Sequence, residues 1–370
     1  GNKRQVHKKI FPKVMNKNYK IAIVIYKFSE GGLERIVSNS TFAFHQMGCE
    51  VHLYVLSSQV GYHYAGRLHQ YPIDALSGVS KMKAYMRFAK SLKQEDFDFI
   101  IDHRCRLNLL MEFFWSKYIY RNQKVFHYIH SADVDSFLFR SERLNRFLYS
   151  GNFICVSKTL AQSLQKKFTS LDCHTIYNPV GFSKDYSNNR GEYIITLSRM
   201  ADDNQKQVDV LLSCYAKSLL PSKGIRLMII GNGSQMQMMK ELANELGIQH
   251  LVDFKGFIPE PYQYIADAKY TVLSSKYEGL PTVLIESLML GTPVIAFDCP
   301  TGPAEIIINK ENGFLIENQN EDEFIKGMNL LAEDHNLYEY LKAHTKESAK
   351  IFSVENFIFE WKELFKKHKR

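Results

Sequence analysis

Three features common in proteins of this size are missing from the sequence. Its 370 residues contain no run of 18 or more apolar residues, so no membrane-spanning segment is predicted. The six cysteines form no C-x-x-C pair, which argues against a zinc site and favours reduced thiols in the cytoplasm. The first residues lack a charged start followed by an apolar stretch and a cleavage site, so we expect no secretory signal. A cytoplasmic protein is therefore expected.

The glycine-rich turn G-x-G-x-x-G of dinucleotide-binding domains is also missing. The segments nearest to it are Gly31-Gly32 and Gly231-Asn232-Gly233, and no acidic residue ends the second expected strand. NAD binding is therefore disfavoured.

Charge is distributed unevenly along a chain whose composition, 45% hydrophobic and 23% charged, is that of a folded protein. Residues 1–180 carry 26 Lys and Arg against 13 Asp and Glu, whereas residues 181–370 carry 21 against 26. A basic first half is typical of a protein that meets an anionic surface, either nucleic acid or an acidic membrane leaflet.

Strand and helix patterns alternate in both halves, which predicts α/β layers with parallel sheets. Strands are expected at 21–26, 51–56, 97–101, 124–130 and 153–156 in the first half, and at 193–197, 226–230, 252–255, 270–273, 293–297 and 313–316 in the second. We place one Rossmann-like domain at 1–180 and another at 181–352, with a last helix at about 353–370 that packs back on the first. Parallel sheets bind ligands at the carboxyl ends of their strands, so we expect a site in a cleft that the two domains face.

The segment 274–293 carries the strongest functional pattern, because it follows an expected strand. Glu278 lies in the loop after that strand, where Gly279 allows close backbone approach and Pro281 suits the first helical position. The free N–H groups of that first turn suit a phosphate. Glu286 lies within an otherwise apolar helix, where a ribose diol can satisfy its carboxylate. Taken alone, the two glutamates could equally be a loop acid and a partnered structural charge.

The spacing of those glutamates, with seven residues between them, resembles the E-x7-E signature of the family-four retaining glycosyltransferases, which have the GT-B fold. The resemblance extends over nearly the whole chain from about Tyr19. It implies an enzyme that moves a sugar from a nucleotide-sugar donor, and it places the donor nucleotide mainly on the second half. The expected donor-binding residues of this segment are Gly279, Leu280, Pro281, Thr282 and Glu286, with Glu278 acting on the donor sugar.

Further segments resemble the same family. Gly31-Gly32-Leu33-Glu34-Arg35 resembles its G-G-x-E-R turn beside the donor diphosphate, although a Gly-Gly pair can also simply start a helix. Arg199 and Lys206 resemble its diphosphate-binding Arg–Lys pair, but six residues separate them where many members have four. This spacing is similar to that of bacterial lipopolysaccharide-core galactosyltransferases. Without the family, the two cations would be interpreted as a solvated surface.

Three more segments complete the expected site. His130, at the end of the strand 124–130, resembles the family's donor-sugar histidine, whereas His127 is expected to be structural. Phe257 and Ile258, after Gly256, resemble its base-binding loop. The sequence Asp133-Val134-Asp135 matches the D-x-D metal motif of a different glycosyltransferase fold, so we interpret it as coincidental. We therefore expect no metal and no cofactor.

The resemblance implies transfer from a UDP-hexose or UDP-N-acetylhexosamine to a lipid-linked oligosaccharide, lipopolysaccharide or other cell-surface glycan. Alternatives are a GDP- or ADP-sugar donor, a protein or polysaccharide acceptor, and a degenerate nucleotide-binding scaffold. A phosphorylase is disfavoured by chain length, and no recognisable nucleic-acid-binding module is present.

The last prediction is peripheral docking on an anionic membrane at the inner face of the cell membrane. Within 80–93, apolar residues recur at helical spacing on one face, and three cations line the other: Met82, Tyr85, Met86, Ala89 and Leu92, with Lys83, Arg87 and Lys90 opposite. This pattern is typical of an interfacial helix, although a core-facing helix with a solvated basic face has the same pattern. Residues 113–121 and 137–147 are expected to widen the surface.

Overall fold

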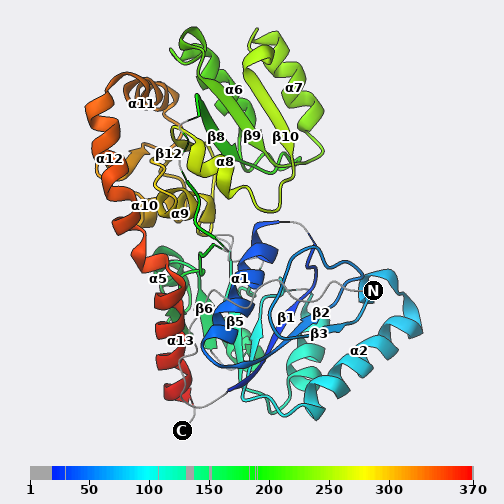
Figure 1. Ribbon diagram of the computed structural model, residues 1–370. Coiled ribbons are helices and arrows are strands. Elements are labelled where there is room, and N and C mark those ends of the chain that lie inside the picture. Colours follow the sequence, from blue (N-terminus) through cyan, green and yellow to red (C-terminus); the bar gives the residue numbers. More distant parts are fainter. Residues whose placement is uncertain are drawn as a thin grey trace. The chain divides into compact units, whose positions relative to one another are not determined.

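The computed structural model describes residues 19–29, 31–106, 108–130, 137–149, 152–182, 184–187, 189 and 191–368. The chain forms two compact units, each built on its own parallel sheet (Figure 1). The first unit contains Gly1–Val156, Ala161–Ser183 and Val354–Arg370, and the second contains Ser157–Leu160 and Lys184–Ser353.

The first sheet has seven strands in the order β3-β2-β1-β4-β5-β6-β7, all paired in parallel. Their bounds are β1 Lys20–Ile25, β2 Glu50–Val55, β3 Arg67–Gln70, β4 Phe99–Asp102, β5 Val125–Ile129, β6 Asn152–Cys155 and β7 Asp172–Thr175. Strands β1, β4 and β5 are buried along almost their whole length, as their continuous apolar runs predict for the centre of a parallel sheet.

Helices cover both faces of this sheet. They are α1 Gly32–Gln46, α2 Gly78–Gln94, α3 Leu109–Phe114, α4 Glu142–Tyr149, α5 Lys158–Lys167 and α13 Val354–His368, with short helical turns η1 Ile73–Ala75 and η2 Trp115–Ile119. Although α13 ends the chain, it packs beside α1 in the first unit (Figure 1). Its Phe365 stacks on Phe99 of β4, with ring centroids 4.3 Å apart, and Trp361 meets Phe44 of α1 at 5.2 Å. These aromatic contacts anchor the last helix to the first sheet.

Helix α2 corrects part of the membrane prediction. Tyr85, Ala89 and Leu92, expected to face lipid, are buried in the core of the first unit. Phe88 lies among them and packs against Trp115, with ring centroids 5.4 Å apart. The apolar stripe of α2 packs against the part of the sheet that contains β2, so it forms part of the core. Met82 and Met86, at the edge of that stripe, stay about half exposed.

The second sheet has six parallel strands in the order β10-β9-β8-β11-β12-β13. Their bounds are β8 Tyr193–Leu197, β9 Arg226–Ile230, β10 Val252–Gly256, β11 Thr271–Leu273, β12 Val294–Phe297 and β13 Gly313–Ile316. The helices are α6 Val208–Lys217, α7 Met236–Glu245, α8 Tyr262–Asp267, α9 Thr282–Met289, α10 Pro303–Ile306, α11 Glu321–Glu333 and α12 His335–Ser348, with short turns η4 Pro221–Lys223, η5 Gln249–Leu251 and η6 Lys350–Phe352. One core cluster joins the sheet to α6, α7, α11 and α12.

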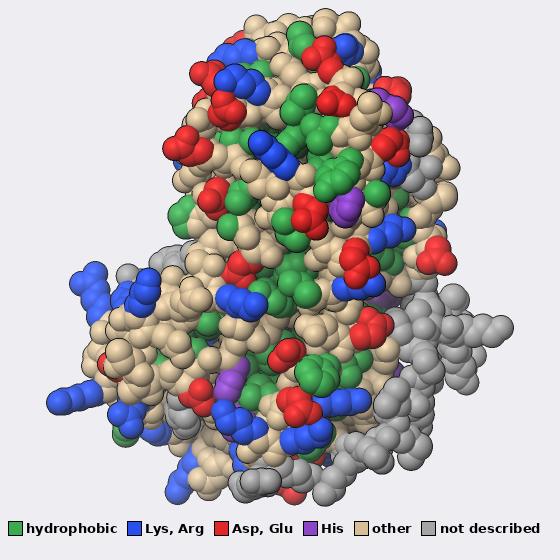
Figure 2. Space-filling model, turned by 90° about the vertical axis from the view of Figure 1, so that its left-hand side faces the viewer, with side chains coloured by type: hydrophobic (Ala, Val, Ile, Leu, Met, Phe, Trp, Pro, Cys, Tyr) green, Lys and Arg blue, Asp and Glu red, His purple; other side chains and the backbone are tan. Residues whose placement is uncertain are grey.

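The described residues contain no helix that is both long enough and apolar enough to cross a bilayer. On the face drawn in Figure 2, several Lys and Arg side chains project from one edge of the lower part.

Candidate functional site

Each sheet has one position where the strand order reverses. In the first sheet this switch point lies between β1 and β4, and in the second it lies between β8 and β11. At such a point the loops leaving two neighbouring strands turn to opposite sides of the sheet and leave room for a ligand at the carboxyl ends. Most of the site residues expected from the sequence follow these strands.

In the second unit, an ion pair joins the two loops at the switch point. Lys206 follows β8 and Glu278 follows β11, and the Lys206 ammonium lies 2.5 Å from Oε1 of Glu278. Glu278 is only 6% exposed, so its carboxylate depends on this cation for compensation. The pair places a cation and a carboxylate side by side at the ligand-binding edge of the sheet.

Hydrogen bonds hold both loops in place. The Gln205 side-chain amide donates to the Tyr277 carbonyl at 2.9 Å, and the Lys276 N–H donates to the Gln205 carbonyl at 2.9 Å. Behind them, the Ser274 hydroxyl lies 2.9 Å from the carbonyl of Lys206. The Lys206–Glu278 pair is therefore part of a fixed backbone arrangement.

Helix α9 begins beside this pair. Pro281 is the residue before the helix and Thr282 is the first helical residue, one position later than expected. The early N–H groups of α9 thus follow Gly279 and Leu280, in an orientation that suits an anion. Glu286 lies in the second turn of α9 and is 1% exposed. The sequence prediction that this carboxylate lies in an apolar helix is confirmed.

The other expected donor residues of the second unit are more open. Arg199 follows β8, its side chain is 62% exposed, and it pairs with Asp203 at 2.9 Å. Phe257 and Ile258 follow β10, the edge strand, and are partly buried. Their roles in donor binding stay predictions.

In the first unit, the turn after β1 contains Gly31 and Gly32. Gly31 has φ 140°, a backbone conformation that residues with a side chain rarely adopt, so glycine is favoured at this position. The Tyr62 hydroxyl donates to the Gly31 carbonyl at 3.1 Å, and Gly32 is the first residue of α1.

His130, which follows β5, is paired with a histidine that the sequence prediction missed. Its Nε2 lies 2.9 Å from Nδ1 of His103, which follows β4. Burial, followed by the neighbouring His103 and Arg106, holds the pKa of His130 well below its ordinary value. Burial lowers the pKa of His103 to about 3 despite the nearby Asp102. Both rings are therefore neutral at pH 7, and one donates to the other.

Behind these rings lies a buried charged cluster that was also missed. Arg104 donates from Nε and Nη2 to the two oxygens of Asp102, both at 3.0 Å, and its Nη1 lies 3.4 Å from Glu112. Burial alone would raise the pKa of Asp102, but Arg104, Arg106 and a hydrogen bond from His127 hold it far below its ordinary value. His127 is a core residue of this cluster, as expected. A sequence signal existed, because a run of charged residues directly follows a buried strand.

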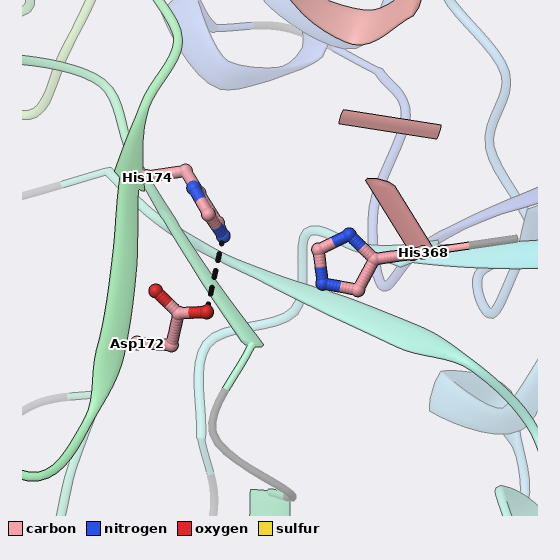
Figure 3. A group of neighbouring side chains, drawn as sticks. All are labelled: Asp172, His174 and His368. Atoms are coloured by element: carbon pink, nitrogen blue, oxygen red, sulfur yellow. Dashed lines mark ion pairs between the residues drawn. The ribbon is translucent and has the colours of Figure 1, made fainter. Parts of the chain in front are cut away.

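One group of the described residues has the geometry to hold a metal ion. Ligand atoms of Asp172, His174 and His368 lie within 4.8 Å of one another, with His174 Nε2 3.4 Å from Asp172 (Figure 3). Asp172 begins β7, so the group lies near the amino end of the edge strand and away from the switch point. It does not suit the transfer chemistry. Asp133 and Asp135 lie outside the described residues.

Two family models match the chain, and together they span residues 30–348. The model described as "Glycosyl transferases group 1" matches residues 182–348, and "Glycosyltransferase Family 4" matches residues 30–183. The junction of the two matches falls near the boundary between the two units.

Several similar curated proteins are bacterial glycosyltransferases. An uncharacterized glycosyltransferase of Haemophilus influenzae is 27% identical over 90% of this chain and 96% of its own length. The Campylobacter jejuni N-acetylgalactosamine-N,N'-diacetylbacillosaminyl-diphospho-undecaprenol 4-alpha-N-acetylgalactosaminyltransferase is 24% identical over 90% of this chain and 95% of its own. The Salmonella typhimurium lipopolysaccharide 1,6-galactosyltransferase is 22% identical over 81% and 85%.

Solved structures share the fold. Staphylococcus aureus TarM, solved with UDP, superimposes with a TM-score of 0.77 at 14% identity, covering 94% of this chain and 99% of its own. Anabaena Alr3699/HepE, solved with UDP and glucose, gives 0.75 at 14% identity, covering 95% and 100%. These likenesses show that the two parallel-sheet units have the GT-B architecture of glycosyltransferases.

Proposed function

Because this chain belongs to the group 1 glycosyltransferases, we propose that it moves a hexose or N-acetylhexosamine from a UDP-sugar to a lipid-linked or cell-surface glycan, with retention at the anomeric carbon. The observation that carries the proposal is the Lys206–Glu278 pair at the switch point of the second sheet. UDP as the nucleotide is supported by the relatives whose structures contain it. A glycan acceptor is supported by the names of the curated relatives.

The donor diphosphate would lie at the start of α9 and against Lys206 and Arg199. Charge that grows on the leaving phosphate would be stabilised by these two cations and by the free N–H groups of the first turn. Lys206 therefore exchanges part of its contact with Glu278 for a phosphate oxygen. Glu278 remains as an acceptor for a hydroxyl of the donor sugar, and Glu286 holds the ribose diol. No metal ion is needed for this arrangement.

A nucleotide screen tests the donor. Thermal unfolding is measured with UDP, GDP, ADP, NAD and a short DNA duplex, because a ligand that binds only the folded state raises its apparent stability. UDP should raise the unfolding temperature and the others should not. Hydrolysis of a panel of UDP-sugars then identifies the transferred sugar. A shift with GDP or ADP alone would mean that the donor is a GDP- or ADP-sugar. A shift with none of them would favour a degenerate scaffold.

We also propose that the first unit docks on an anionic membrane through an α2–α4 surface, formed by exposed apolar side chains of three helices and the cations around them. The apolar members are Val79, Met82, Met86, Leu110, Phe113 and Phe147, and the cations on α2 are Lys81, Lys83, Arg87 and Lys90. Val79 is 72% exposed and Leu110 is 83% exposed, so packing in the core does not explain why these positions are apolar.

A ring contact joins the α3 and α4 parts of this surface. Phe113 of α3 and Phe147 of α4 have ring centroids 6.3 Å apart, and the Lys117 ammonium lies 3.7 Å above the Phe147 ring. In the core beneath the surface, Tyr85 of α2 meets Phe114 of α3, with ring centroids 6.1 Å apart. Apolar side chains with a basic border fit the boundary between headgroups and acyl chains. Each cation near an acidic leaflet contributes about 1 kcal/mol.

Vesicle flotation at low salt tests the membrane proposal. Replacing Lys83, Arg87 and Lys90 with Glu should abolish binding to phosphatidylglycerol vesicles while UDP binding persists. The matched control reverses three exposed cations of the second unit, Lys217, Lys223 and Lys326, and should still bind. Wild-type protein that ignores phosphatidylglycerol vesicles, or the two triple variants behaving alike, would refute the proposal.

A further inference from the structure

Two arginines, Arg104 and Arg106, follow β4. They differ in whether the Nε–Nη2 edge of the guanidinium is hydrogen-bonded. Arg104 uses Nε and Nη2 together, each 3.0 Å from an oxygen of Asp102. These two nitrogens form the edge of arginine that binds carboxylates and phosphates with two parallel hydrogen bonds. In Arg106 the same two atoms are buried, and among the described residues neither has a hydrogen-bond partner.

The remaining contacts of Arg106 orient the side chain without filling that edge. Its Nη1 donates to the Arg104 carbonyl and lies 3.5 Å from Asp102. Its guanidinium carbon lies 5.3 Å from the centre of the Tyr149 ring. Both oxygens of Asp102 already accept shorter hydrogen bonds from Arg104, so the charge of Arg106 is only partly compensated. An arginine that is 8% exposed, with one edge unused, is costly unless a further partner binds it.

The neighbouring histidines offer further unused atoms at the same place. Nε2 of His103 and Nδ1 of His130 are buried and have no hydrogen-bond partner among the described residues. Arg106 is close enough to both rings to lower the pKa of each. His103 and Arg106 follow β4 and His130 follows β5, so these atoms lie beside the switch point of the first sheet. Several unfilled polar atoms therefore lie close together at the edge where parallel sheets bind ligands.

We propose that the Nε–Nη2 edge of Arg106 binds an oxyanion, a phosphate or carboxylate group, carried by the glycan acceptor, with the His103–His130 pair beside it. The proposal rests on the transfer function proposed above and names the chemistry of its acceptor. An anionic group held in two parallel hydrogen bonds would fix the acceptor on the first unit while the nucleotide occupies the second. Neutral acceptors would lack this anchor.

Phosphate and acetate titrations followed by NMR of the histidine imidazole nitrogens test the anion site without any sugar transfer. In the wild type, the signals of His103 and His130 should shift along a saturable curve with inorganic phosphate, with acetate, or with both, and should not shift with chloride at equal ionic strength. Arg106→Gln should weaken this binding at least about tenfold, because it removes a charge-assisted bidentate contact. Arg106→Lys should fall between, since it keeps the charge and loses the fork. The control is Arg67→Gln, an exposed cation on β3.

Two outcomes overturn the site: no response of the wild type to either anion, or an equal response in Arg106→Gln. Tryptophan fluorescence checks that each variant is folded. If Arg106→Gln does not fold, Arg106→Lys is compared with the wild type in its place. Slow hydrolysis of the UDP-sugar, which needs no acceptor, distinguishes the two possible sources of the anion. The proposal expects the KM of the UDP-sugar in this reaction to be the same for Arg106→Gln as for the wild type. A raised KM of the UDP-sugar would assign the anion to the donor and overturn the acceptor assignment. Wild-type protein that hydrolyses no nucleotide-sugar but still responds to phosphate would count against the transfer function alone.

Discussion

The two switch points of this protein hold their charges in different ways. In the second unit, Lys206 and Glu278 form one pair across two loops, at the edge of the sheet. In the first unit, Asp102, Arg104 and Glu112 form a network that is almost wholly withdrawn from water, and Arg106 and His103 lie in front of it. A single pair that bridges two loops can exchange partners when a ligand arrives, whereas a buried network of several charges is a fixed support. In the function proposed above, the second unit would take up developing charge and the first would hold a substrate in place.

The largest expected effect concerns acid, and it should appear only in the first unit. Burial holds the pKa of His103 at about 3 and that of His127 at about 4, below an unfolded value of about 6.5. The unfolded chain therefore binds more protons below pH 6.5, and stability falls as the pH falls. At pH 5 each histidine should cost about 2 kcal/mol of unfolding free energy.

Tryptophan fluorescence checks this prediction, since both tryptophans, Trp115 and Trp361, are buried in the first unit. Urea unfolding followed by this fluorescence should show a much lower unfolding free energy at pH 5 than at pH 7. Hydrogen exchange of peptides from the second unit, where His250 and His335 are exposed, provides the internal control. An equal loss of stability in both units would contradict the prediction that acid destabilises only the first.

The second prediction concerns the Lys206–Glu278 pair. Lys206→Ala should lower the rate of transfer on the order of 10²-fold, because it removes a cation from the developing phosphate charge. Arg199→Ala should lower it by a similar order. In a double-mutant cycle, adding Glu278→Ala to Lys206→Ala should cost less than Glu278→Ala alone, since the two side chains contact each other. Strict additivity of the two losses would show that they act separately.

Much of this architecture was predictable because the central strands are apolar and buried. Strands β8, β9 and β13 coincide residue for residue with the sequence prediction. The two missed strands, β3 and β7, are edge strands whose residues are exposed or only partly buried. Their sequences, Arg67–Gln70 and Asp172–Thr175, are mostly polar and show no apolar run. Edge strands are stabilised by one neighbour, so the hydrophobic pattern that reveals central strands is weak there.

The functional residues divide in the same way. Glu278 and Glu286 were predicted from their spacing and Lys206 from the family resemblance, and the structure places Lys206 against Glu278. The run of charged residues around His103 and Arg106 was a signal, but their spacing alone does not indicate a site, because their meaning depends on which strands are neighbours. The prediction that the apolar face of α2 lies against lipid was partly wrong for a related reason. A stripe such as Tyr85 and Leu92 predicts an apolar face, but only the position of the sheet decides what covers it.

The smallest expected effect is that of metal removal. Transfer should continue at an unchanged rate in EDTA, because side chains and helix N–H groups supply the positive charge at the second switch point. Assays with and without added Mn²⁺ or Mg²⁺ measure this directly. A strict metal requirement would bring Asp133 and Asp135 back into consideration and would weaken the assignment of Lys206 and Arg199 to the diphosphate.

The most direct test of the central claim is calorimetric titration of UDP into four proteins: the wild type, Lys206→Ala, Glu286→Gln and Arg106→Gln. The account assigns the nucleotide mainly to the second unit. UDP should therefore bind Lys206→Ala and Glu286→Gln at least about tenfold more weakly than the wild type, through loss of contacts to the diphosphate and the ribose. Arg106→Gln should bind UDP as the wild type does. UDP affinity that survives both changes in the second unit, or that is lost with Arg106→Gln, would contradict the account.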